Sequence, residues 1–187
     1  MTSQNTSDVY LSAFEQRLEQ QLLRELNAKG VMGSQLLNAE DIDQKFETFL
    51  QEYVADAVPQ IVDYPMVSIA WAAYLGMGLA QLWDADFDRF TAVPYPSFYG
   101  PRGFDDMDEN ILFNILGVEA NSNEAHRWEK LIQSVSQSCL TAIRAEQIEP
   151  QSPMAFHVFV RTVKVAARIG AALWLTKLGY KYEKVEM

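Results

Sequence analysis

The sequence contains a single cysteine, Cys139, and only two histidines, His126 and His157, in 187 residues. One cysteine cannot form an internal disulfide, and its place on the apolar face of a helix predicts a buried structural thiol. A zinc or di-iron site needs more cysteine or histidine ligands than the chain has, in patterns that it lacks. We therefore expect a cytoplasmic protein of the reducing cytosol that has no transition-metal chemistry.

Other signatures are also missing. The chain has no glycine-rich phosphate loop, no dinucleotide-binding glycine pattern and no G-x-S-x-G nucleophile motif. It is short of positive charge, with 15 Lys and Arg against 25 Asp and Glu and a net charge of −10, which argues against nucleic acid as a partner. The first residues, MTSQNTSD, have neither the basic start nor the apolar run of a secretory signal.

The strict alternation of a half-buried strand is absent, whereas apolar residues recur at helical spacing throughout. This spacing predicts an all-α, single-domain bundle of about six helices. The predicted helices span residues 8–28, 39–57, 65–83, 106–116, 122–147 and 152–179. We expect a disordered N-terminus at residues 1–7, the helical domain at 8–179 and a C-terminal tail at 180–187. The tail contains Tyr180, Tyr182 and Val185, which are candidates for docking on a partner subunit.

Residues 64–83 carry no charge over a length that is close to a membrane span. The flanking residues are Asp63 and Asp84 instead of Lys or Arg, and several Ala and Gly lower the hydrophobicity. These features favour a central core helix over a membrane helix. Small residues on this helix and on the last one predict that the two approach each other closely at the centre of the bundle.

A long stretch at residues 84–104 separates the third and fourth predicted helices and is rich in aromatic residues and proline. We expect an irregular loop that packs onto the body, with Tyr95 and Tyr99 as candidate ligand-binding residues. Asp84, Asp86 and Asp88 resemble the start of a calcium loop, but Arg89 stands where such a loop needs glycine. They are candidate ligands for Mg²⁺ or Ca²⁺, and the alternative is a solvated loop. A second acidic run at residues 105–109 is typical of a first helical turn, with Asp105 as its cap.

The most informative pattern is a stripe of titratable side chains on the last helix. His157, Arg161, Lys164 and Arg168 are spaced by four, three and four residues, so they lie on one side of a helix that is otherwise apolar. From Met154 onward the chain carries six Lys or Arg against two acids, a charge of +4, so the remainder carries −14. Buried cations need partners. The stripe therefore forms internal ion pairs, lines a pocket for an anion, or faces water or another chain.

Two functions remain open at this level. The first hypothesis is a non-enzymatic module that binds another protein or a second copy of itself. The second is a protein or enzyme that binds an anionic small molecule between the basic stripe and the aromatic loop, with Mg²⁺ as a bridging ion in one version. Neither hypothesis involves nucleic acid or a membrane.

Overall fold

The computed structural model describes residues 2–182 and contains seven α-helices and no β-strand among them. The all-α, single-domain prediction is confirmed. The helices are α1 (Thr2–Ala28), α2 (Glu40–Ala57), α3 (Pro65–Ala85), α4 (Phe87–Ala92), α5 (Met107–Glu109), α6 (Asn123–Ala145) and α7 (Pro153–Lys177). Short 3₁₀ turns occur at η1 (Val58–Gln60), η2 (Tyr95–Phe98) and η3 (Phe104–Asp106), and a π-helical turn at η4 (Asn110–Ile115).

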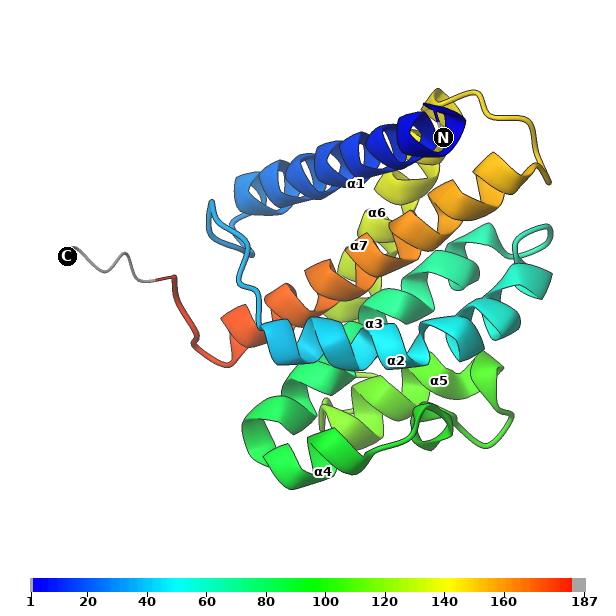
Figure 1. Cartoon of the computed structure of the whole chain (residues 1–187). Coiled ribbons are helices and arrows are strands. Elements are labelled where there is room, and N and C mark those ends of the chain that lie inside the picture. Colours follow the sequence, from blue (N-terminus) through cyan, green and yellow to red (C-terminus); the bar gives the residue numbers. More distant parts are fainter. Residues whose placement is uncertain (1, 183–187) are drawn as a thin grey trace.

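The centre of the bundle is the pair α3 and α7, which lie between α1 at the top of Figure 1 and α4 at the bottom. Both helices are apolar on nearly all sides and are buried along most of their length. Gly76 and Gly170 bring the two backbones together. A Cβ atom at Gly76 would lie 2.0 Å from the carbonyl oxygen of Ala167, and one at Gly170 would lie 2.0 Å from that of Ala73. The predicted close approach of these helices is confirmed.

The outer helices each turn one apolar face inward. In α1 this face consists of Leu11, Phe14, Leu18, Leu22 and Leu26, all of them buried. The N-termini of α6 and α7 lie at the serines where the sequence predicts these helices to begin. Ser122 and Ser152 each accept a hydrogen bond from the backbone N–H three residues on, at 3.1 Å.

The first helix begins earlier than its periodicity predicts. Residues 2–7, which we expected to be disordered, are the first turns of α1. Once a helix has nucleated on its packed part, each further residue adds a backbone hydrogen bond at little extra cost, so the helix extends beyond the apolar stripe. At the other end of the chain, residues 183–187 of the expected tail, including Val185, lie outside the described residues.

α3 is the one helix in the described part of the chain that is long and apolar enough to cross a membrane. In the structure, 72% of its most apolar window is buried inside the bundle. The core helix of a soluble protein passes the same test of length and composition, so the apolar character of α3 is weak evidence for a membrane span.

The stretch at residues 84–104 is more regular than we expected. The last turn of α3, the short helix α4 and the turn η2 occupy most of it. Asp86 caps α4 by accepting a hydrogen bond from the Arg89 backbone N–H at 3.0 Å. The expected packing of its aromatic residues is seen for Phe90, Tyr95, Phe98 and Phe104, which are buried. Aromatic burial supplies the tertiary contacts that order these short elements.

The second acidic run forms the first turn of α5, but Asp105 does not cap it. The carboxylate of Asp106 instead accepts hydrogen bonds from the backbone and guanidinium of Arg102, the shortest at 2.7 Å. Gly100 permits this turn, because a Cβ atom there would lie 2.4 Å from the Cβ of Asp106.

Candidate functional site

The basic stripe of α7 forms ion pairs with the neighbouring helices α1 and α2. Arg161 donates to Glu15 of α1 at 2.7 Å, and Lys164 donates to Glu47 of α2 at 2.6 Å. Arg168 contacts three carboxylates: Glu15 at 3.2 Å and Glu19 on α1, together with Asp43 on α2 at 3.7 Å. Of the three interpretations of the stripe, internal ion pairs describe these three cations.

The ion pairs with Arg161 and Arg168 favour the charged form of the Glu15 carboxylate. Burial disfavours its charged form, but the hydrogen bond from Arg161 and the charge of Arg168 outweigh burial, so the pKa of Glu15 lies below its ordinary value. A cavity along the stripe, lined by Lys164 and Arg168 among others, has a volume of about 20 Å³. That space is of the size of a single water molecule. The stripe therefore docks α7 against α1 and α2, and this cavity beside it is too small for an organic anion.

The other residues that we singled out are not gathered around the stripe. His157 is exposed on the first turns of α7, with its ring beside that of Phe156 at 5.8 Å. Tyr95 and Tyr99 both donate hydrogen bonds to one oxygen of Asp56, the first at 2.7 Å. Since these hydroxyls are already bonded inside the protein, the two tyrosines hold the η2 turn against α2.

The acidic residues at the end of α3 also have separate structural partners. Asp84 accepts a hydrogen bond from the Tyr180 hydroxyl at 2.6 Å, Asp86 caps α4, and Asp88 lies exposed in the first turn of that helix. Within residues 2–182, no group of three or more His, Cys, Asp or Glu side chains is close enough to hold a metal ion. The structure thus does not bring these three carboxylates together as a site for Mg²⁺ or Ca²⁺.

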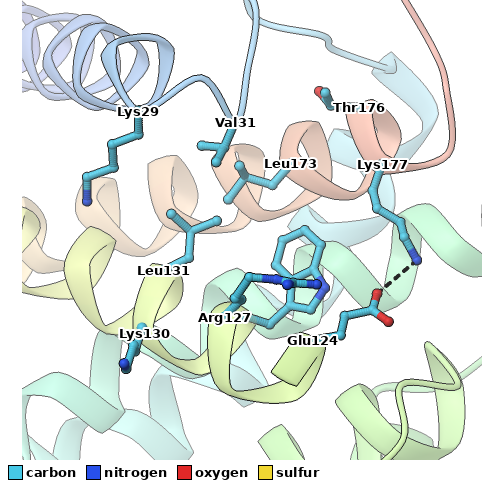
Figure 2. Close-up of a pocket in the computed structure, with 10 residues that line it drawn as sticks. Lys29, Val31, Glu124, Arg127, Lys130, Leu131, Leu173, Thr176 and Lys177 are labelled. Atoms are coloured by element: carbon cyan, nitrogen blue, oxygen red, sulfur yellow. Dashed lines mark ion pairs between the residues drawn. The ribbon is translucent and has the colours of Figure 1, made fainter. Parts of the chain in front are cut away.

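A different part of the surface is hollowed. A groove of about 540 Å³, here named the α6–α7 groove, lies where the end of α1 passes over α6 and α7 (Figure 2). Its lining residues are Lys29, Val31, Glu124, Arg127, Trp128, Lys130, Leu131, Leu173, Thr176 and Lys177.

The apolar side chains of this groove pack against the core of the bundle. Leu173 is buried, and Trp128 packs against the buried Trp174 with ring centroids 5.4 Å apart. Val31 contributes from the segment between α1 and α2, and Leu131 contributes from α6. Because Trp128, Leu131 and Leu173 belong to one core, the apolar surface of the groove is largely formed in advance of any binding.

Cations surround the apolar surface. The groove holds four of them, Lys29, Arg127, Lys130 and Lys177, and one carboxylate, Glu124, so it carries three net positive charges on a chain of net charge −10. Lys177 is paired with Glu124 at 3.1 Å and also lies over the Trp174 ring, 4.7 Å from its centroid.

The other three cations of the groove have no carboxylate partner within ion-pair distance among the described residues. Lys29 donates to the Ser134 hydroxyl at 2.6 Å. Among residues 2–182, Arg127 and Lys130 form no ion pair. Three cations without a carboxylate partner thus border one apolar surface, and this combination suits a molecule that is itself both anionic and apolar.

Our sequence reasoning missed this groove, although part of the signal was present. Glu124, Arg127 and Leu131 are spaced by three and four residues on α6, which places them along one side of that helix, and Lys130 lies at the edge of that side. Such a row is usually a solvated face. Only the crossing of α1 and α7 over it creates a groove.

Comparison of the chain with protein-family models, with curated proteins and with solved structures finds no match in any of the three.

Proposed function

We propose that this protein binds a small amphipathic anion in the α6–α7 groove. The observation that supports the proposal is the concentration of unpaired positive charge around a preformed apolar surface, on a protein that is acidic overall. A local positive potential on an acidic molecule attracts an anion toward that region, which gives the site electrostatic selectivity.

The size of the groove favours a small molecule over a protein partner. Ligand sites for small molecules commonly have volumes of about 300–1,000 Å³, and the groove has about 540 Å³. A stable protein interface involves roughly 20–30 residues on each side, whereas ten residues line this groove. The groove alone is too small for a stable protein complex.

The expected mode of binding divides the ligand into two parts. An aliphatic or aromatic body covers Trp128 and Leu131 and is removed from water there, which supplies most of the affinity. A carboxylate, sulfate or phosphate group lies near the unpaired cations, which contribute orientation and a salt-dependent part of the affinity.

Calorimetric titration with decanoate and with decanol tests this proposal directly, since the two ligands share a chain and differ in charge. Decanoate should bind about tenfold more tightly than decanol at low salt, and the difference should shrink at high salt. Equal affinities for the two ligands, or no binding of decanoate at all, would overturn the proposal.

Variants of α6 localise the binding. Arg127→Gln and Lys130→Gln should each weaken decanoate binding by about three- to tenfold. The matched control is Arg144→Gln, because Arg144 is exposed on the same helix and does not line the groove. If the control weakens binding as much as the groove variants do, the effect reflects net charge and not this site.

A second candidate function is self-association, and it rests on a different surface. The connection between α2 and α3 exposes three large apolar side chains within seven residues: Val58 at 40%, Val62 at 78% and Tyr64 at 61%. Apolar side chains exposed this closely together are typical of an interface. Light scattering at increasing concentration tests it: a dimer that Val62→Asp dissociates supports self-association, and a strict monomer argues against it.

The cytosol stays the predicted location.

A further inference from the structure

The two ends of the α6–α7 groove differ in charge. Figure 2 shows Lys29 and Lys130 on one side of Leu131 and Leu173, and the pair Glu124–Lys177 on the other side. At the first end the cations have no carboxylate partner in the described part of the chain. At the second end, the carboxylate of Glu124 is already paired with Lys177, and Arg127 adds a smaller electrostatic contribution to the same carboxylate.

Glu124 forms an ion pair at the surface of the groove. Its carboxylate accepts from Lys177 at 3.1 Å, and the hydrogen bond to Lys177 is the main reason why the pKa of Glu124 lies below its ordinary value, with a smaller contribution from Arg127. Glu124 is therefore ionised at neutral pH. It also lies in the first turn of α6, where the helix dipole favours a negative charge.

We propose that Glu124 makes the groove specific for anions with a single acidic head. The head binds at the end formed by Lys29 and Lys130, and the apolar chain runs over Trp128 and Leu173 toward Lys177. This inference rests on the proposed function and adds the class and orientation of the ligand.

The geometry explains why a second acidic group is rejected. Lys130 and Glu124 are six residues apart on α6, which corresponds to roughly 9 Å along the helix axis and about 120° around it. An aliphatic dicarboxylate of about ten carbons whose first acid binds Lys130 is long enough to bring its second acid near Glu124. Two carboxylates at short range repel each other, and Lys177 cannot neutralise both. An uncharged chain end meets no such penalty, because the pair Glu124–Lys177 is already neutral.

The test compares decanoate with decanedioate by calorimetry in the wild type and in Glu124→Gln. The wild type should bind decanoate at least about tenfold more tightly than decanedioate. In Glu124→Gln, the freed Lys177 should accept the second acid, so the preference should fall to about twofold or reverse. The control is Glu129→Gln, which removes an exposed acid of the same helix outside the groove and should keep the wild-type preference.

Lys177→Gln is the reciprocal variant and keeps the test decisive if Glu124→Gln does not fold. It leaves Glu124 without its cation, so the preference for decanoate should increase by about threefold or more. A preference that neither variant changes would overturn the assignment of Glu124. Equal wild-type affinity for both acids would also overturn it while leaving the proposed function intact, whereas failure of decanoate to bind at all would contradict the proposed function itself.

Discussion

Replacing Gly170 by alanine should be among the most damaging single changes in this protein, although it adds only one methyl group. The new Cβ atom would lie 2.0 Å from the backbone carbonyl oxygen of Ala73, and ordinary contacts of such atoms begin near 3.4 Å. The two helices would have to separate by about 1.4 Å at their crossing. Neither atom belongs to a side chain that can rotate away.

The magnitude follows from two opposing effects. Alanine in place of glycine within a helix gains about 1 kcal/mol of helix propensity. Overpacking of a well-packed core costs about 1–3 kcal/mol and occasionally more, and here the separation also loosens contacts along the whole α3–α7 interface. We expect a net loss of about 2–4 kcal/mol in the free energy of unfolding, and a similar loss for Gly76→Ala, whose Cβ meets the carbonyl of Ala167 at the same distance.

Urea unfolding followed by circular dichroism measures these losses against two graded controls. At Gly78 the nearest atoms belong to the side chains of Phe98 and Ile111, at 3.1 and 3.3 Å, so Gly78→Ala should stay within about 1 kcal/mol of the wild type. Gly33 has nothing within 4 Å, so Gly33→Ala should be neutral or slightly stabilising. If Gly170→Ala is as stable as Gly78→Ala, the reasoning about the helix crossing is refuted.

Three other results are expected. Arg168→Met should lower the unfolding free energy by about 3 kcal/mol, because it leaves three partly buried carboxylates without their common cation; unchanged stability in urea titrations would mean that the ion pairs do not hold α1 in place. Burial raises the pKa of Asp108 from 3.8 to about 6, so the folded state keeps a proton that the unfolded chain loses, and stability should fall as the pH rises from about 4 to about 6. Asp108→Asn should remove this fall and raise stability at pH 7 by about 1–2 kcal/mol, which urea titrations across that pH range measure; an unaltered pH profile speaks against burial as the cause. Burial also raises the pKa of the Cys139 thiol to about 12, so a chromogenic disulfide should react with it only as fast as the protein unfolds, and rapid reaction with the native protein would show that the thiol is accessible.

Much of the fold could be predicted because the deciding signals are local. Ser122 and Ser152 mark the starts of α6 and α7, and the small residues around Gly76 and Gly170 indicate which helices meet at the centre. The misjudged loop at residues 84–104 is a segment whose order comes from tertiary contacts. Residues 84–104 have weak helical periodicity, and they become regular because Tyr95 and Phe98 pack into the core that α2 and α3 form.

The candidate site was harder to predict for the same reason. The basic stripe is visible as a spacing on α7, and the need of Arg168 for negative partners follows from its burial. The identity of those partners does not follow, because Glu15 and Glu19 stand about 150 positions earlier in the chain. Likewise, Arg127 and Lys130 look like part of a solvated helix face until the end of α1 is placed above them.

The sequence by itself determined that this chain forms helices, where most of them begin and end, and which faces turn inward, since caps and apolar periodicity act within one or two turns. Only the tertiary structure decided which carboxylates meet the cations of α7 and which cations stay unpaired around the α6–α7 groove. Charge pairing and cavity shape depend on how helices cross, and a crossing joins residues whose separation along the chain carries no information about their distance in space.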